Sequence, residues 1–297
     1  MESMPRPSLS VIIPVHEGRS GVLHIALSSI TRQSLGLAAA VEVIVVQDGA
    51  GDGASDVVGA FRSLLNLEYL VLERGHGVSA ARNLGIDASS APLVLFLDSD
   101  DLLVATCLET LLAFSRANPD TDLFYSNSQR FSASGGVFSL GRPIISDAYH
   151  ELYRQRLASR LNPLLHSIFV GHAVMVRRRP LMAVGGFDEN KSCAELTDLV
   201  LSLHRNGYRL SHIPRKLYMY RRSAGGLSES IRLHAERADS ITRTYEVLFD
   251  EVLLDVVALG RVEPYGHYHY RLRDRQGRLV IPDYVNYEAY AELARRS

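Results

Sequence analysis

Short apolar runs alternate with amphipathic segments over the first 116 residues of the chain. The apolar runs are 9–13 (LSVII), 41–46 (VEVIVV), 67–72 (LEYLVL) and 93–97 (LVLFL), and a polar loop follows each of them. The intervening segments 22–34, 55–65, 78–89 and 102–116 place their apolar residues at helical spacing. Strands that are apolar on both faces are typical of a parallel sheet that helices cover on both sides. The alternation therefore predicts right-handed βαβ units in a doubly wound, mostly parallel α/β sheet.

The pattern is less regular after residue 120. Strands are predicted over 123–131, 169–178, 210–214 and 216–222, and helices over 147–161, 193–208 and 231–259, with a hairpin around DRQGRL. A short helix in RPLMAVGGF ends at Gly185 and Gly186. We divide the chain into a first half, 1–120, a second half of the same domain, 121–230, and a C-terminal helical and Tyr-rich extension, 231–297.

The composition is that of an ordinary globular protein. Of its 297 residues 46% are hydrophobic, and the net charge of −1 gives no reason to expect nucleic-acid binding. The run Arg177–Arg179 is interpreted as a solvated face. Cys107 and Cys193 lack the spacing of a disulfide framework or a zinc site, and suit a reducing compartment. No apolar run approaches the ~20 residues that span a bilayer, and we expect a cytoplasmic protein.

The four loops that follow the first four predicted strands share one kind of chemistry. They read PVHEG, QDGAGD, ERGHGVSAARN and DSDD, and in an open parallel sheet such loops meet at the ligand-binding edge. Each loop alone is weak evidence of a binding site, because Asp-Gly pairs usually form turns and Asp101 is equally compatible with capping the next helix. Together they supply acceptors for a nucleobase, a basic residue and paired carboxylates.

The paired carboxylates of DSDD favour a metal site. A nucleoside diphosphate is itself strongly negative, so that neighbouring aspartates would repel it. A hard cation such as Mg²⁺ or Mn²⁺ between them takes oxygen ligands from protein and phosphate together. The sequence therefore predicts a divalent cation beside a nucleoside diphosphate.

Six segments of the chain resemble the motifs of family-2 inverting glycosyltransferases with the GT-A fold. They are SVIIPVHEG, VEVIVVQDGAGDG, GHGVSAARNLGI, LVLFLDSDD (the DXD motif), VGGFDEN and DLVLSLHRNGYRL, in this order within residues 8–222. The resemblance implies a donor half in 1–120 and an acceptor half in 121–230. It implies transfer of a sugar from a UDP-, GDP- or dTDP-sugar to an acceptor, which is a small molecule, a glycan or a peptide.

The resemblance also implies roles for individual residues. Asp48 would accept a hydrogen bond from the base, Asp98 would contact the ribose or the sugar, and Asp100 would bind Mn²⁺ or Mg²⁺. The residues that would contact the nucleotide sugar are Pro14, Val15, Glu17, Asp48, Arg82, Asp98 and Ser99.

The chain departs from the family pattern at the catalytic base. The family usually supplies the base from a Glu-Asp pair, and the corresponding residues here are Glu195 and Leu196. Glu195 and Asp198 are the candidate replacements, because positions i and i+3 lie near one helix face. Both are equally compatible with carboxylates that favour a helix N-terminus. His172 is a third candidate for the base.

Two further departures affect the donor side. Ser223 stands where family members often carry a histidine close to the diphosphate, and Gln47 stands where an aspartate is common. Arg221 and Arg222 are candidates for diphosphate or acceptor contacts without that histidine.

Three classes of function therefore remain open. The first is a glycosyltransferase with a modified site, acting on an ordinary hydroxyl or on a more nucleophilic acceptor such as a thiol. The second is a nucleotide-sugar-binding protein or partner subunit with little transfer, because Leu196 replaces the base. The third is a nucleotidyltransferase, although PVHEGRSG lacks the glycine-rich basic loop of that class. The C-terminal extension is a candidate surface for homo-oligomers.

Overall fold

The computed structural model describes residues 6–35, 41–51, 53–134, 137–144, 173–191 and 195–222, with four short strands between 261 and 281. The helices predicted over 147–161 and 231–259 lie outside these residues, as does His172. Among the described residues, no helix is long and apolar enough to cross a membrane.

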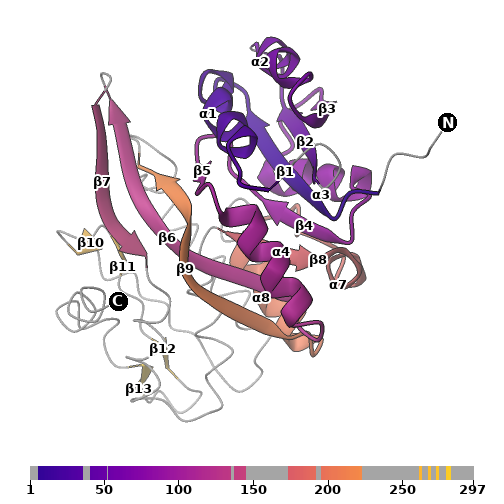
Figure 1. The fold of residues 1–297 in the computed structure, drawn as a ribbon. Helices are drawn as coiled ribbons and strands as arrows, with labels where there is room; N and C mark the ends of the chain where they lie inside the picture. The colour runs from indigo at the N-terminus through magenta and orange to yellow at the C-terminus, as the bar shows by residue number, and fades with distance from the viewer. Residues whose placement is uncertain are drawn as a thin grey trace.

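A nine-stranded sheet lies at the centre of the fold (Figure 1). Its first four strands, in the order β3, β2, β1 and β4, are parallel, as predicted. Strand β8 then pairs antiparallel with both β4 and β6, and marks the junction with the second half of the sheet. The strands in spatial order are β3 (Asn66–Leu72), β2 (Val41–Asp48), β1 (Leu9–His16), β4 (Leu93–Phe96), β8 (Val174–Arg177), β6 (Leu123–Ser134), β9 (Leu210–Arg221) and β5 (Leu102–Leu103), and β7 (Val137–Ile144) pairs with β6.

Helices pack on both faces of the sheet because successive strand residues point to opposite sides. One buried cluster joins the strands to α1 (Ser20–Thr31), α2 (Ala54–Phe61) and α4 (Cys107–Ala117). The other cluster joins them to α3 (Val78–Ala88), α7 (Arg178–Ala183) and α8 (Glu195–Arg205). The doubly wound arrangement is therefore confirmed.

The helix predicted over 102–116 begins later than expected, at Cys107. Residues Leu102 and Leu103 instead form β5, which pairs antiparallel with Met219 and Tyr218 of β9. The buried side chain of Gln33 then accepts a hydrogen bond from the Leu108 N–H, 2.9 Å away, in the first turn of α4. Tertiary pairing thus overrides the helical pattern of 102–106.

Two consecutive arginines at the end of β8 hold the carboxyl ends of two helices. Arg177 donates to the carbonyls of Ser115 and Thr121, at the end of α4 and just beyond it. Arg178 donates to the Ile86 carbonyl and the Ser89 hydroxyl at the end of α3. The interpretation of this run as a solvated face is wrong for both residues, because cations stabilise the unpaired carbonyls of a helix C-terminus.

The segments predicted as two strands over 210–214 and 216–222 form one strand, β9, with irregular pairing to β6 near Asn127. The C-terminal hairpin is confirmed. Strands β12 (Leu272–Arg273) and β13 (Leu279–Ile281) pair antiparallel on either side of the predicted turn.

Candidate active site

The predicted donor-side residues meet at the carboxyl edge of the four parallel strands. Asp48 is the last residue of β2, Asp98 lies two residues beyond β4, and Arg82 lies on α3, which packs against β1 and β2. Asp98 is the first residue of a tight turn in which the Asp101 N–H donates to the Asp98 carbonyl at 3.1 Å. Ser99 lies within this turn and is buried. The sheet therefore assembles loops that are distant in sequence at one place.

Asp48 organises the loop that precedes α3. Its carboxylate is buried, and it accepts the backbone N–H groups of His76, at 2.7 Å, and Gly77, at 2.9 Å. Gly77 has φ +93°, a conformation that favours glycine. A carboxylate has about four lone-pair sites, so these two contacts leave capacity for the predicted hydrogen bond from a nucleobase.

The loops after β1 and β2 lie against each other. The Glu17 N–H donates to the Asp48 carbonyl at 3.1 Å. A Cβ at Gly49 would lie 3.1 Å from Glu17 Oε2, a tight contact, and the φ of +102° at this position itself favours glycine. Pro14 and Val15 are buried, and Val15 belongs to the core. A contact of Val15 with a nucleotide would therefore use its backbone.

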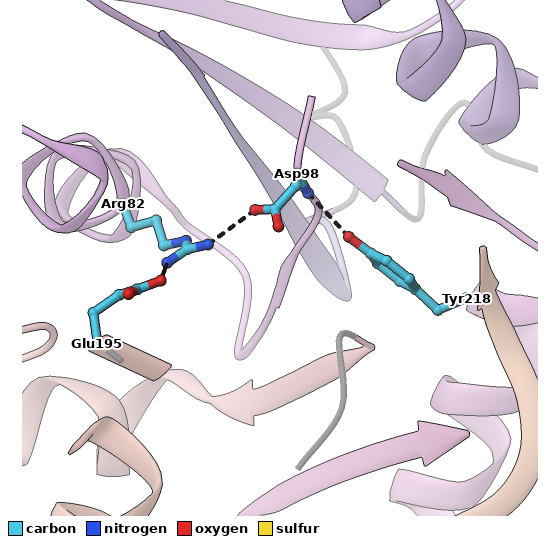
Figure 2. Close-up of polar contacts among 4 residues, drawn as sticks. All are labelled: Arg82, Asp98, Glu195 and Tyr218. Atoms are coloured by element: carbon cyan, nitrogen blue, oxygen red, sulfur yellow. Dashed lines mark hydrogen bonds and ion pairs between the residues drawn. The ribbon is translucent and has the colours of Figure 1, made fainter. Parts of the chain in front are cut away.

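Arg82 joins the donor side to helix α8 (Figure 2). Its Nη2 donates to Asp98 Oδ1 at 2.9 Å, and its Nη1 donates to Glu195 Oε1 at 2.7 Å. The guanidinium also lies over the ring of Phe187, 5.2 Å from its centroid, a distance typical of a cation–π contact. Arg82 thus bridges two carboxylates that lie far apart in the sequence, 16 and 113 residues after it.

The bridge keeps Arg82 charged in a buried place. Its side chain is only 7% exposed. Burial alone would lower the pKa of Arg82, but the charges of Asp98 and Glu195 and their hydrogen bonds raise it above the ordinary value. Buried charges are tolerated when they are paired in this way.

Asn83, next to Arg82, clamps the loop before α8. Its Nδ2 donates to the Phe187 carbonyl and its Oδ1 accepts the Phe187 N–H, both at 2.9 Å. A Cβ at Gly186 would lie 2.6 Å from Asn83 Oδ1, and Gly186 has φ +71°. The motif VGGFDEN is therefore fixed directly on the motif SAARN, which gives Asn83 a structural role.

Three aspartates of the DSDD segment occupy different environments. The Asp98 side chain is 36% exposed and contacts Arg82. Burial and the charge of Asp98 raise the pKa of Asp100, whereas the charges of Arg19 and Arg221 lower it. Asp101 is buried, and its Oδ1 accepts the Arg221 N–H at 2.7 Å. Asp101 therefore anchors β9 and does not cap α4, whose N-cap is Thr106.

Tyr218 supports the same turn from β9. Its hydroxyl accepts the Asp98 N–H at 3.2 Å (Figure 2). Burial and the charges of Asp101 and Asp98 raise the pKa of Tyr218 well above its usual range, so that the hydroxyl stays protonated. The sequence singled out Asp98 but gave no sign of this partner 120 residues away.

The turn fits a hard cation that also binds phosphate. Within the described ranges, no three His, Cys, Asp or Glu side chains are grouped to hold a metal. Asp98 and Asp100 are nevertheless close enough for the charge of one to raise the pKa of the other. Mg²⁺ usually binds through one or two carboxylates together with substrate phosphates and water, and Asp98 and Asp100 supply ligands of this type.

The two carboxylates of α8 that are candidates for the catalytic base have different partners. Glu195 lies in the Arg82 bridge, with its side chain 18% exposed. Asp198 instead pairs with Lys191, at 2.8 Å, and both side chains are mostly buried. Leu196, at the usual position of the base, packs against the core cluster on this face. The structure therefore brings Glu195, but not Asp198, into the Arg82 network.

Arg221, the last residue of β9, and Arg222, which follows it, lie beside this turn. The Arg222 N–H donates to the Phe131 carbonyl at 2.7 Å, which continues the pairing with β6. Arg221 Nη2 is 3.4 Å from the Ala133 carbonyl, while its Nε and Nη1 are buried without a hydrogen-bond partner in the described part of the chain. Arg221 thus has unused donors next to the turn that carries Asp100.

Comparison with known proteins identifies the family to which this arrangement is related. A family model described as "Glycosyl transferase family 2" matches residues 10–185, more than half of the chain. A validoxylamine A glucosyltransferase of Streptomyces hygroscopicus is 37% identical over 108 residues, 36% of this chain and 25% of that protein. A PGL/p-HBAD biosynthesis glycosyltransferase of Mycobacterium bovis is 32% identical over 169 residues, 54% of this chain and 64% of that protein. The chain thus spans less than two thirds of these relatives.

Solved structures share the fold. TarS 1–349 of S. aureus in complex with UDP-GlcNAc has a TM-score of 0.62 and 20% identity, over 82% of this chain and 67% of that chain. The mannosyltransferase PcManGT of Pyrobaculum calidifontis, in complex with GDP-Man and Mn²⁺, has a TM-score of 0.62 and 18% identity, over 83% and 65%. The expected GT-A fold is confirmed by this likeness.

Proposed function

We propose that this chain, which belongs to glycosyl transferase family 2, transfers a sugar from a nucleoside diphosphate to an acceptor, with inversion at the anomeric carbon. The observation that carries the proposal is the Arg82 bridge, which joins a carboxylate of the DXD turn to the first residue of α8. It brings a donor-side group and a candidate base into one network. UDP-GlcNAc and GDP-Man, which two of the similar structures contain, support a donor of this class.

The donor would lie across the loops at the sheet edge. Asp48 and the loop of Glu17 would bind the nucleoside, and Asp98 would contact the ribose or the sugar. Arg82 would keep the Asp98 carboxylate in place through the 2.9 Å contact. Two backbone N–H groups hold the Asp48 carboxylate in place. The nucleobase would therefore donate its hydrogen bond to a carboxylate that is already positioned.

In the proposed reaction, the acceptor oxygen attacks the anomeric carbon as the bond from that carbon to the diphosphate oxygen breaks. The electron pair of that bond leaves with the diphosphate, and the proton of the acceptor passes to a carboxylate on the opposite side. Glu195 is our candidate for this carboxylate. Its contact with Arg82 uses Oε1, and a carboxylate has a second oxygen that can accept the proton.

Asp100, with Asp98 beside it, would hold Mn²⁺ or Mg²⁺ together with the diphosphate. Such a cation stabilises the charge that develops on a leaving diphosphate. The protein residues contribute the position of the two carboxylates, because the turn is held by Tyr218 from one side and by Arg82 from the other.

A donor panel tests this proposal. The protein is incubated with UDP-, GDP- and dTDP-sugars, with Mn²⁺ or with EDTA, and thermal stability and release of the nucleoside diphosphate are measured. We expect at least one donor to raise the melting temperature and to be hydrolysed slowly, only when the metal is present. Asp100→Asn should abolish both effects, whereas Asp120→Asn, at an exposed position, should abolish neither. If no donor gives a metal-dependent response, the proposal is wrong.

One observation favours a second function, binding of a nucleotide sugar without efficient transfer. Leu196 packs against the core where the family places its base, and Glu195 is held by Arg82. If the base has been lost, Leu196→Asp should create or strongly raise transfer while donor affinity stays the same. Leu196→Asn is the matched control without the charge. Wild-type transfer that Leu196→Asp does not raise would exclude this second function.

A further inference from the structure

Strand β7 carries two exposed apolar side chains on one face. Phe138 is 55% exposed and Leu140 is 64% exposed, and residues two positions apart in a strand point to the same side. The Phe138 ring stacks on the buried ring of Phe131 in β6, with 5.3 Å between the centroids and 23° between the planes. On the other face of the hairpin, the hydroxyls of Ser132 and Ser139 are 2.7 Å apart. The hairpin therefore has a polar face and an apolar face, the latter formed by Phe131, Phe138 and Leu140.

The pairing of three strands joins this apolar face to the Asp98–Asp101 turn. Leu140 pairs with Phe131 of β6, and Phe131 pairs with Arg221 of β9. Neighbouring strands lie about 4.8 Å apart, so this row places Leu140 roughly 10 Å from Arg221. The Arg221 N–H donates to the Asp101 carboxylate at 2.7 Å. The apolar face thus begins on the strand next to β9, whose last residue is fixed on the turn.

The apolar face and the candidate base Glu195 lie on the same side of the sheet. Tyr125 of β6 belongs to the core cluster that joins the sheet to α3, α7 and α8. The irregular pairings place their extra residues in β7 and β9, so β6 itself alternates regularly. Phe131, an even number of positions after Tyr125, therefore points to the side of α3 and α8. Glu195 begins α8 and accepts a hydrogen bond from Arg82 of α3, on this same side.

The end of the hairpin extends past β9. Pairing with β9 ends at Phe131, whereas β6 continues to Ser134 (Figure 1). An acceptor that gives its proton to Glu195 approaches from the side of α8, and this side of the sheet continues onto the apolar face. Exposed apolar side chains that adjoin one another mark a binding surface more often than single ones do. The other exposed large apolar side chains in the described ranges lie outside the hairpin: Leu64, Val71 and Met182.

We propose that Phe138 and Leu140 bind an aryl group of the acceptor while its nucleophile lies at Glu195. This inference rests on the proposed function. A flat ring extends the stack that Phe131 and Phe138 begin, since aromatic rings gain from offset or edge contacts beyond the area that they bury. Leu140 adds apolar surface beside the stack. The acceptor is thus a molecule with a hydroxyl or other nucleophile at one end and an aromatic ring at the other.

Saturation-transfer NMR with matched glycosides tests the aryl site. The probes are phenyl β-D-glucopyranoside and phenyl β-D-galactopyranoside, each compared with its methyl counterpart, and the full chain is used with Mg²⁺ and without donor. We expect saturation of the phenyl protons and at least tenfold tighter binding of the phenyl glycosides. Phe138→Ser and Leu140→Ser should each weaken phenyl binding by about two- to tenfold and leave binding of the methyl glycosides unchanged. Phe138→Tyr, which keeps the flat ring, should bind like the wild type.

The matched control is Leu64→Ser, because Leu64 is 60% exposed outside the hairpin, and both kinds of glycoside should bind to it as to the wild type. Phenyl glycosides that bind no better than methyl glycosides overturn the aryl site, as do equal losses in Leu64→Ser and Leu140→Ser. A dimer in analytical ultracentrifugation that Phe138→Ser dissociates also overturns it, because a second copy then covers the apolar face. Binding to phosphatidylglycerol vesicles that Phe138→Ser abolishes overturns it in favour of a lipid surface.

The donor panel separates this inference from the proposed function. A wild-type protein with no metal-dependent response to any donor contradicts the proposed function itself. A wild-type protein that responds to a donor but shows no preference for phenyl glycosides overturns the aryl site alone.

Discussion

Arg82 and Glu195 are hydrogen-bonded at 2.7 Å although 113 residues separate them in the sequence. The contact ties α3 to the first residue of α8, and the same guanidinium binds Asp98. The turn after β4 and the start of α8 therefore share one buried cation, and a change at any of the three residues reaches the other two.

Replacement of Arg82 should destabilise the protein. Arg82→Met leaves two carboxylates without their cation, and breaking a buried pair of this kind typically costs about 3–5 kcal/mol. Urea unfolding measures the loss. Adding Glu195→Gln to Arg82→Met should recover part of it, because one unpaired charge is removed. The control is Arg209→Met, whose partner Asp120 is 3.8 Å away and largely exposed, with an expected cost below about 1 kcal/mol. Equal losses for the two arginines would contradict the bridge.

Replacement of Glu195 separates catalysis from structure. Glu195→Gln keeps a carbonyl oxygen for Arg82 but cannot accept a proton. If Glu195 is the base, kcat should fall by about 10²–10⁴-fold, far more than donor affinity falls, and the unfolding midpoint should fall less than in Arg82→Met because Asp98 still pairs with Arg82. Asp198→Asn is the matched variant on the same helix, and we expect a much smaller fall in kcat because Asp198 pairs with Lys191. An unchanged kcat for Glu195→Gln would remove Glu195 as the base.

Gly85 of α3 should not tolerate alanine. A Cβ at this position would lie 2.5 Å from Ile12 Cγ2 of β1. Overpacking of this kind costs about 1–3 kcal/mol, which exceeds the gain of about 1 kcal/mol in helix propensity. Gly59→Ala in α2, where no atom lies within 4 Å of the added Cβ, should instead stabilise the protein slightly. The melting temperatures of the two variants show whether the steric clash at Gly85 outweighs the gain in helix propensity.

Glu42 should make stability depend on pH in the acidic range. Burial raises the pKa of Glu42, but hydrogen bonds from Ser10, Ser90 and Ala91 outweigh it and lower the pKa below its ordinary value of 4.5. The folded state thus binds this proton less readily than the unfolded state does, and the stabilisation is complete above pH 4.5 and lost as the pH falls through the folded pKa.

Urea unfolding of Glu42→Gln, compared with the wild type between pH 7 and pH 3, measures this contribution. The difference in unfolding free energy should be constant near neutral pH and should shrink below about pH 4.5. A gap between wild type and Glu42→Gln that does not change with pH would contradict the assignment.

The sequence predicts the elements of the first half of the fold because their signals are local. Four apolar runs and the polar loops after them place Asp48, Asp98 and Asp100 at one edge of a parallel sheet. The partners of these residues are not local. Tyr218 reaches Asp98 from β9, and no periodicity indicates which residue of a strand will meet a turn 120 residues earlier.

The errors of sequence interpretation have the same origin. Residues 102–106 have a helical pattern, but Leu102 and Leu103 pair with β9. Arg177 and Arg178 read as a solvated run, because only the folded chain shows the helix carbonyls that they reach.

The order of the strands also determines whether the chain can be divided into two fragments that fold. Strand β5, formed by residues 102–103, lies at the far end of the sheet beside β9, and β8 is inserted between β4 and β6. A fragment that ends at residue 120 would carry β5 away from its partner and would leave the edge of β4 bare. The two halves of the chain, expressed separately, should therefore not fold alone. Mixed together, they should behave as a complementing pair whose reassembly can be read out by recovery of nucleotide binding.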